Sequence, residues 1–218
     1  MKSDNSVAKS WQQLLLQNRV IAVIRSPKIE VGLAMAKAVA DGGIKLIEVT
    51  WNSAYPAATI LRLRSELPHC IVGAGTILNL DQLQEAIAAE AQFIFCPHFS
   101  LTLLKTSIFQ YQIPLVPGVL TPTEIVTAWQ AGATTVKVFP VRALGGARYL
   151  KSLRQPLSQI EFIPTGGVTI DNAKAMLDAG AIAIGLSSDL LLPTAVAACN
   201  WQEITQRTQT LLSKINTI

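Results

Sequence analysis

The chain has 218 residues, of which 50% are hydrophobic and 15% charged, and its formal net charge is +4. This length predicts one domain or at most two. The high apolar and low charged content excludes an intrinsically disordered chain. The excess of Lys and Arg forms no cluster, which is atypical of a nucleic-acid-binding protein and suits a small anionic substrate better.

Cysteine and histidine are scarce and scattered. Cys70, Cys96 and Cys199 form no CxxC motif, so we expect no disulfide framework and a reducing, cytoplasmic location. Only His69 and His98 are present, which excludes a His-rich metal site and leaves open a carboxylate-bound ion. The first twenty residues lack the apolar region of a signal peptide, and no apolar run is long enough to predict a membrane span.

The sequence then alternates between two kinds of segment. Residues 4–18 predict an extra helix, and short runs rich in β-branched residues follow, most of them ending in Gly, Pro, Thr or Ser. These predicted strands are 20–25, 45–50, 70–76, 92–97, 113–119, 134–140, 161–167 and 181–185. Helical spacing of apolar residues marks the intervals 31–43, 80–91, 121–133 and 171–181.

Local signals agree with this division. The first of those helices should stop at Gly42 and Gly43, and Thr121 with Glu124 has the spacing of a capping box. Asp171 is expected to cap the last of the four helices.

Strands that alternate with helices predict parallel pairing, and eight such units predict a single-domain (β/α)8 barrel. We expect residues 1–19 to form an N-terminal helical extension and residues 20–218 to form the barrel. The rival fold is an open doubly wound sheet, but its GxGxxG fingerprint is absent, and the nearest match, GAGT at 73–76, lacks the third glycine.

Three predicted strands carry a charge where a buried strand should have none: Arg25, Glu48 and Lys137. If Glu48 and Lys137 both face inward, they meet at the end of the barrel where active sites of this fold lie. Burial disfavours the ammonium form, and a neutral amine can form a Schiff base with a carbonyl while a carboxylate moves protons. The alternative is a buried ion pair without chemistry, although such pairs contribute little to stability.

Glycine-rich ends of the last two strands indicate phosphate binding. The motif PTGG (164–167) ends the seventh strand and GLSSD (185–189) ends the eighth, which is where barrels usually bind phosphate. The alternative is that these glycines only turn the chain. Thr76 similarly has two interpretations, a carboxylate contact or the cap of the next helix.

These motifs, in this order, resemble the family of aldolases that act on 2-keto-3-deoxy-6-phosphogluconate (KDPG) and 4-hydroxy-2-oxoglutarate (KHG). The resemblance covers about residues 15–195 and rests on IEVT (47–50), GAGT (73–76), CPH (96–98), VPGV (116–119), KVFP (137–140) and PTGGV (164–168). Each motif alone is unspecific, but their order, with a lysine two residues before Phe-Pro, is specific.

The resemblance implies a class I aldolase that needs no metal or cofactor, is a homotrimer of (β/α)8 barrels, and takes a 2-keto acid and a phosphorylated aldehyde as small-molecule partners. It implies that Lys137 forms the Schiff base and that Glu48 is the general acid and base. The binding residues that it implies are Thr76 for the pyruvyl carboxylate, Pro97 and Phe139 in the pyruvyl pocket, and Thr165, Gly166, Gly167 and Ser188 for the phosphate or second carboxylate.

The chain also departs from the family pattern. Asn52 stands where many members have an arginine, and we expect Arg25 to bind the carboxylate instead. Arg142 stands where a glutamate is common, and Ser187 where a glycine is common; the sequence assigns no role to either change. Two other functions therefore stay open: a non-catalytic phosphosugar-binding barrel, and an epimerase or isomerase, which would not need Lys137.

Overall fold

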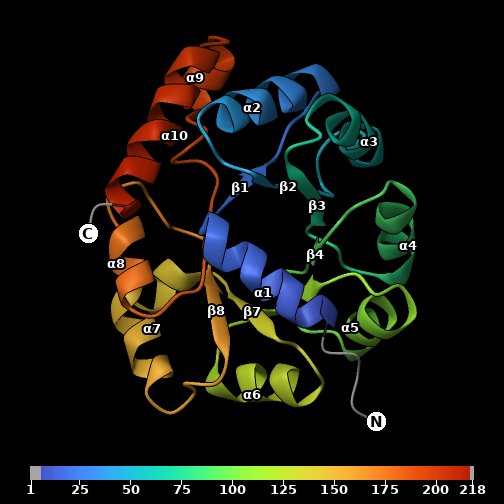
Figure 1. Cartoon of the computed structure of the whole chain (residues 1–218), viewed down its shortest axis with the longest axis vertical. Coiled ribbons are helices and arrows are strands. Elements are labelled where there is room, and N and C mark those ends of the chain that lie inside the picture. Colours follow the sequence, from blue (N-terminus) through green and yellow to red (C-terminus); the bar gives the residue numbers. More distant parts are fainter. Residues whose placement is uncertain (1–5, 217–218) are drawn as a thin grey trace.

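The computed structural model describes residues 6–216 and shows a curled parallel β-sheet surrounded by helices (Figure 1). The strands are β1 (Val20–Ile24), β2 (Leu46–Thr50), β3 (Ile71–Gly75), β4 (Ile94–Phe95), β5 (Leu115–Val116), β6 (Gly118–Val119), β7 (Thr135–Val138), β8 (Glu161–Pro164) and β9 (Ile184–Leu186). The α-helices are α1 (Ser6–Asn18), α2 (Ile29–Asp41), α3 (Pro56–Glu66), α4 (Leu80–Ala88), α5 (Leu101–Lys105), α6 (Pro122–Gln130), α7 (Ala147–Arg154), α8 (Ala173–Asp178), α9 (Pro193–Ala197) and α10 (Trp201–Asn216). A π-helical turn, η1 (Thr106–Gln110), follows α5, and a 3-10 turn, η2 (Val141–Leu144), follows β7.

The strands form two parallel sheets that meet at Pro117. One has the order β5-β4-β3-β2-β1-β9 and the other β6-β7-β8. Pro117 has no N–H group, so the strand predicted at 113–119 is divided into β5, which pairs with β4, and β6, which pairs with β7. At the other end, isolated parallel bridges join Phe162 to Ala181 and Thr165 to Gly185. The α/β class and the parallel pairing of all eight predicted strand segments are confirmed.

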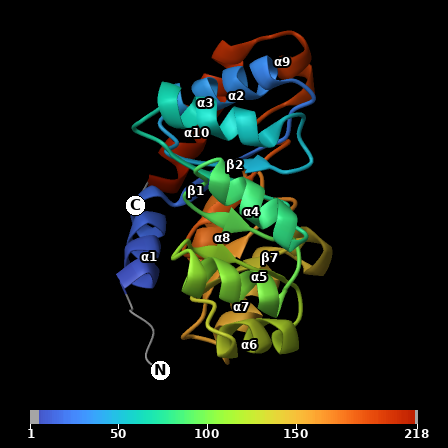
Figure 2. The same cartoon turned by 90° about the vertical axis from the view of Figure 1, so that its right-hand side faces the viewer.

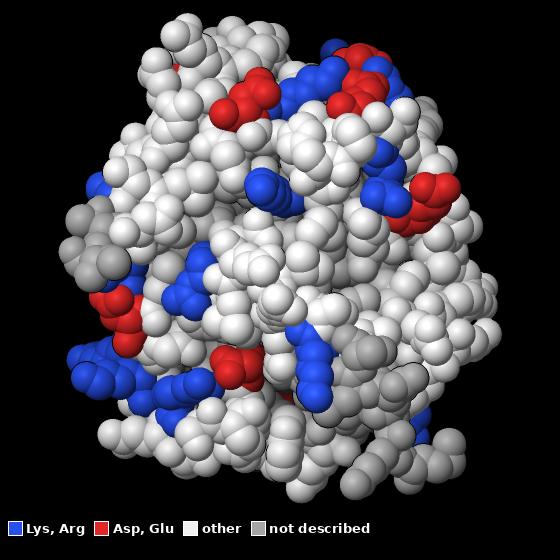
Figure 3. Space-filling view, viewed as in Figure 1, with Lys and Arg blue, Asp and Glu red and all other residues white. Residues whose placement is uncertain are grey.

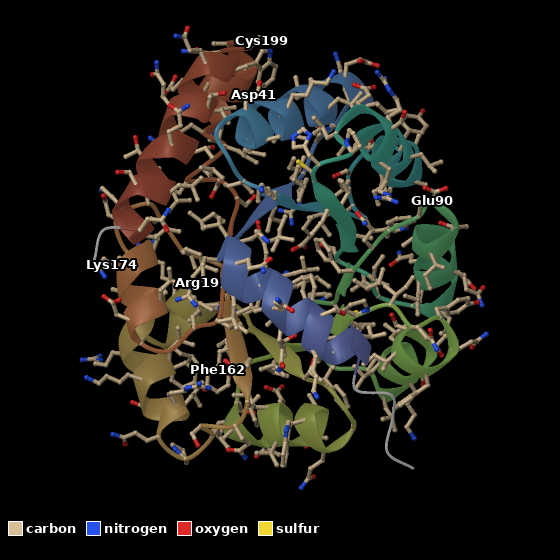
Figure 4. The ribbon with its side chains drawn as sticks, in the orientation of Figure 1. Arg19, Asp41, Glu90, Phe162, Lys174 and Cys199 are labelled. Carbon is tan, nitrogen blue, oxygen red and sulfur yellow. The ribbon has the colours of Figure 1, made fainter. Side chains whose placement is uncertain are left out.

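The strand register divides the core into an inner and an outer layer. Paired residues such as Ile21 and Leu46 share the inner side with Ile163. The next residues along each strand, such as Ala22 and Ile47, pack outward under the helices with Phe162, which is labelled on β8 in Figure 4. The next inward position on each strand is two residues further along. On β2 this position is Glu48, which therefore lies nearer the carboxyl end of the strand than Leu46.

Helix α1 covers the amino ends of the strands, and it crosses in front of them in Figure 1 and stands to one side of them in Figure 2. Its Trp11 is 2% exposed and donates a hydrogen bond from Nε1 to Oγ1 of Thr135, the first residue of β7, at 3.1 Å. The Trp11 ring also lies 5.2 Å from the ring of Phe93 and 6.4 Å from that of Phe95. The extra helix predicted at residues 4–18 is thus confirmed from residue 6, and residues 4 and 5 lie outside the described residues. The helix closes one end of the sheet with aromatic side chains.

Helix ends follow the sequence signals with one exception. Thr121 and Glu124 form the predicted capping box of α6, and α2 ends at Asp41 with Gly42 as its C-cap. The prediction that Asp171 caps the helix of 171–181 was wrong, because Asn172 precedes α8 and Asp171 pairs with Lys214 of α10 at 2.6 Å. Asp171 thus forms an ion pair with α10 on the surface and makes no capping hydrogen bond to α8.

The surface carries few charges for its area. On the face that bears α1, Lys, Arg, Asp and Glu are separated by wide uncharged areas (Figure 3). No helix among residues 6–216 is both long enough and apolar enough to span a membrane.

Candidate active site

A cavity of about 290 Å³ lies at the carboxyl ends of the strands and gathers every site residue predicted from the sequence. Its lining residues are Val23, Arg25, Glu48, Thr50, Thr76, Pro97, Lys137, Phe139, Thr165, Gly166, Gly167, Val168, Gly185, Ser187 and Ser188. These residues come from seven different strand ends, which is the arrangement expected of an active site in a parallel α/β fold.

Lys137 of β7 and Glu48 of β2 face each other in this cavity. The Lys137 Nζ atom lies 3.6 Å from Glu48 Oε1, and their side chains are 7% and 1% exposed. Oε1 of Glu48 is fully buried and accepts no hydrogen bond from the described residues. A buried carboxylate oxygen without a hydrogen-bond donor is costly for stability, so this arrangement favours a chemical role for the pair over a structural one.

Glycine makes room for the carboxylate. Gly75 pairs with Thr50 at the end of β3, and a Cβ atom there would overlap the Glu48 carboxylate. The GAGT motif therefore supplies the space that Glu48 occupies, in addition to placing Thr76 at the cavity.

Two aromatic rings enclose the amine of Lys137. Its Nζ lies 5.4 Å from the ring centre of Phe95 and 5.4 Å from that of Phe139. Phe95 is buried, whereas Phe139 is 37% exposed and lies at the opening of the cavity. The amine therefore lies between two aromatic rings and one carboxylate, that of Glu48.

Arg25 extends from the end of β1 and is held by its neighbours. Its Nε donates to Oδ1 of Asn52 at 3.1 Å, and its two terminal NH₂ groups make no hydrogen bond or ion pair within residues 6–216. The loop that bears Asn52 is tied to the loop after β1, because Ser53 Oγ accepts from the Ser26 backbone N–H at 3.1 Å and lies 3.2 Å from Thr50 Oγ1. Asn52, which departs from the family pattern, thus orients the arginine that we expect to bind the carboxylate.

Thr76 adopts a strained backbone conformation at the cavity. Its φ is +60°, which is unusual for a β-branched residue and costs on the order of 1–3 kcal/mol. The cap of the next helix is Asn79, whose side chain accepts from Gln82 N–H. The capping alternative for Thr76 is therefore wrong, and the strain at a cavity-lining residue favours the binding interpretation.

The distal part of the cavity is formed by the PTGG and GLSS segments. Gly166 and Gly167 have φ of +83° and +89°, and both line the cavity with Ser187 and Ser188. Thr165 is 8% exposed, and its Oγ1 would lie 2.6 Å from a Cβ atom at position 185, so Gly185 makes room for it. Residues with a side chain rarely adopt this positive φ, so the backbone of both glycines faces the cavity without a Cβ atom.

Other polar candidates lie outside the cavity. His98 is exposed, and Cys96 faces the outer core, where burial raises the pKa of its thiol to about 12. Cys96 is therefore a protonated packing residue. Among residues 6–216, no three His, Cys, Asp or Glu side chains lie close enough together to hold a metal ion.

Sequence reasoning did not select five of the lining residues: Val23, Thr50, Val168, Gly185 and Ser187. Val23 and Thr50 follow from period-2 alternation, because they share the inward side with Arg25 and Glu48. Gly185 carries no chemical signal, since its role is to leave space for Thr165.

Comparison with known proteins agrees with this geometry. Residues 12–207 match the family model described as KDPG and KHG aldolase. The KHG/KDPG aldolase of Escherichia coli strain K12 is 35% identical over 202 residues, covering 91% of this chain and 94% of that protein.

Solved structures of this family have the same fold. The KDPG aldolase of Legionella pneumophila, described with pyruvate captured at low pH as a covalent carbinolamine intermediate, is 29% identical with a TM-score of 0.85 and covers 92% of this chain and 97% of its own. The 2-keto-3-deoxy-6-phosphogluconate aldolase of Zymomonas mobilis, solved with 3-phosphoglycerate, is 27% identical with a TM-score of 0.80, covering 92% and 94%.

The family model spans most of the chain, and the identity to the E. coli aldolase extends over nearly the full length of both proteins. The chain therefore belongs to the KDPG/KHG aldolase family and is an aldolase, a carbon–carbon lyase.

Proposed function

We propose that this protein is a class I aldolase that cleaves KDPG to pyruvate and glyceraldehyde 3-phosphate through a Schiff base on Lys137. We extend the proposal to KHG, which would give pyruvate and glyoxylate. The observation that carries it is the buried Glu48 oxygen that accepts no hydrogen bond within residues 6–216 and lies 3.6 Å from the Lys137 amine.

In the first step, the Lys137 amine attacks the C2 carbonyl of the keto acid, and loss of water from the carbinolamine gives an iminium. The position of Lys137 supports this step, because its side chain lines the cavity, where a bound keto acid can reach the amine. The pyruvate carbinolamine described for the Legionella enzyme is the same type of adduct.

In the second step, Glu48 accepts the C4 hydroxyl proton through a water molecule while the C3–C4 bond breaks. The aldehyde leaves, and the bonding electrons remain on C3 as an enamine conjugated with the Lys137 nitrogen. Protonation of C3 and hydrolysis of the iminium then release pyruvate and restore the amine. Among residues 6–216, Glu48 is the one carboxylate that forms an ion pair with Lys137, which supports one group for both proton transfers.

The remaining lining residues orient the substrate. The two free NH₂ groups of Arg25 and the hydroxyl of Thr76 bind the pyruvyl carboxylate, and Pro97 and Phe139 contact the methylene carbons. Thr165, Gly166, Gly167 and Ser188 bind the phosphate, supported by the positive φ angles of the two glycines.

We further propose that the two sheets act as one closed (β/α)8 barrel. The two isolated bridges between the β8 and β9 segments, together with the chain continuity through Pro117, support closure. A closed barrel would hold all strand ends of the cavity in fixed relation, as a reaction with two acid–base steps requires.

A homotrimer is the proposed assembly, and the cytoplasm the proposed location. Large apolar side chains that are exposed in one chain support assembly, and several follow one another along the segment from β3 to α6: Leu78, Leu80, Leu101, Phe109 and Trp129. Three free cysteines support a reducing compartment.

The test is a retro-aldol assay that measures pyruvate release from KDPG and from KHG. Wild-type protein should release pyruvate from KDPG and Lys137→Ala should not, with equal melting temperatures showing that both are folded. Absence of pyruvate release by folded wild-type protein would favour the non-catalytic phosphosugar-binding alternative. Turnover retained by Lys137→Ala would contradict the Schiff-base mechanism.

A further inference from the structure

Arg142 lies against the phosphate-binding loop without a partner of its own. It belongs to the η2 turn after β7, and its backbone N–H donates to the carbonyl of Gly166 at 3.1 Å. Its aliphatic stem covers Gly167 so closely that a Cβ atom there would overlap Arg142 Cβ. The pairing of these two loops therefore depends on glycine at position 167.

A second cavity, of about 430 Å³, adjoins the first at this point. Arg142, Gly146, Thr169 and Asn172 are among its lining residues, and Gly167 lines both cavities. The backbone of Gly167, which has no side chain, therefore borders both spaces. A group bound over the Gly166–Gly167 backbone lies at their border.

Charge is distributed unevenly around this border. Glu48 is the one acidic residue that lines either cavity, and it faces Lys137. Arg142 is exposed, and its guanidinium makes no ion pair or hydrogen bond within residues 6–216, whereas Arg62, Arg154 and Arg207 are all paired. An unpaired guanidinium beside neutral backbone donors is suited to a dianionic phosphate.

We infer that Arg142 is a specificity-determining residue that binds the substrate phosphate and makes the enzyme prefer phosphorylated over unphosphorylated 2-keto acids. The inference rests on the proposed function and adds to it a charged contact beside the Gly166–Gly167 backbone. The neutral donors at Gly166, Gly167 and Ser188 position the phosphate. Arg142 supplies a positive charge that a phosphorylated substrate uses and an unphosphorylated one does not.

The experiment compares kcat/KM for KDPG and for its unphosphorylated counterpart, 2-keto-3-deoxygluconate. Arg142→Gln should lower kcat/KM about tenfold more for KDPG than for the unphosphorylated acid, through a higher KM, since a charged hydrogen bond is worth about this factor. Arg142→Lys should recover part of the loss, because it keeps the charge without the fork. The matched control is Arg148→Gln, an exposed arginine six residues on that lines neither cavity and should change neither value.

A second readout does not depend on turnover. Inorganic phosphate should raise the melting temperature of wild-type protein and of Arg148→Gln, and at least a tenfold higher phosphate concentration should be needed for the same shift in Arg142→Gln. If the wild type cleaves neither acid but phosphate still discriminates between the variants, the proposed function fails and the phosphate contact stands. Two results would overturn the role of Arg142. One is an Arg142→Gln variant in which the ratio of kcat/KM for the two acids is unchanged, and the other is an identical phosphate-induced shift of the melting temperature in wild type, Arg142→Gln and Arg148→Gln.

Discussion

The two ends of the curled sheet are built from the same alternating strand positions but have opposite chemistry. At the amino ends, Trp11 packs on Phe93 and Phe95 and its one polar atom is hydrogen-bonded to Thr135. At the carboxyl ends, Glu48 and Lys137 occupy inward positions, and a buried carboxylate oxygen lacks a hydrogen bond. One end satisfies its buried groups and stabilises the fold, whereas the other leaves a polar atom unsatisfied for chemistry.

Phe95 belongs to both regions. One side of its ring packs against Trp11, and the Lys137 amine lies 5.4 Å from its centre. The apolar interior is therefore continuous from the closed end to the Lys137 amine. Substitutions at the two ends should consequently separate into losses of activity and losses of stability.

The largest expected effect is at the reactive end. Glu48→Gln keeps the side-chain shape but cannot accept a proton, so kcat for pyruvate release should fall by about 10²–10⁴-fold. Steady-state kinetics at saturating KDPG measure this, with the melting temperature as the folding control. A kcat within threefold of the wild type would show that another group moves the protons.

Trp11→Ala addresses the closed end. Removal of this buried ring should lower the free energy of unfolding by about 3–5 kcal/mol, because the neighbouring aromatic rings cannot fill the cavity. Urea denaturation measures it, and Trp129→Ala, at a site 41% exposed, is the control, expected to cost less than about 1 kcal/mol. Equal losses for the two variants would contradict the role of α1 in closing the sheet.

Arg25→Ala should affect substrate binding more than either chemistry or folding. Loss of a charged hydrogen bond to the carboxylate, about 1.5–3 kcal/mol, should raise KM more than tenfold. Lys28→Ala, which removes an exposed cation from the same loop, should leave KM unchanged. An unchanged KM in Arg25→Ala would show that the carboxylate is bound elsewhere.

The smallest effect concerns the cysteines. Because burial raises the pKa of the Cys96 thiol to about 12, it stays protonated at pH 8, whereas Cys199 is exposed. Iodoacetamide at pH 8 should label Cys199 first and leave activity unchanged, as peptide mass spectrometry will show. Equally rapid labelling of Cys96 in folded protein would contradict its burial in the outer core.

Much of this contrast was predictable because it depends on local patterns. Hydrophobic periodicity located the strands, and a charge inside a buried strand identified Glu48 and Lys137 before any contact between them was known. All ten predicted site residues line one cavity because parallel strands end at the same edge.

The remaining features depend on tertiary contacts that no local pattern encodes. The break at Pro117 depends on which neighbour each half-strand pairs with, and Asp171 is paired with Lys214, 43 residues away in the chain. The hydrogen bond between Arg25 and Asn52 joins two loops, so neither residue alone indicated it. The space left by Gly75 for Glu48 is likewise visible only from the packing of β2 against β3.

The central claim is that Lys137 is the amine that reacts, and borohydride trapping tests it most directly. Protein incubated with pyruvate and sodium borohydride should gain one reduced pyruvyl group on the peptide that contains Lys137 and lose activity. Glu48→Gln should still be labelled, because its amine is intact, whereas Lys137→Ala should not. A label on another lysine, or no label on folded wild-type protein, would contradict the account.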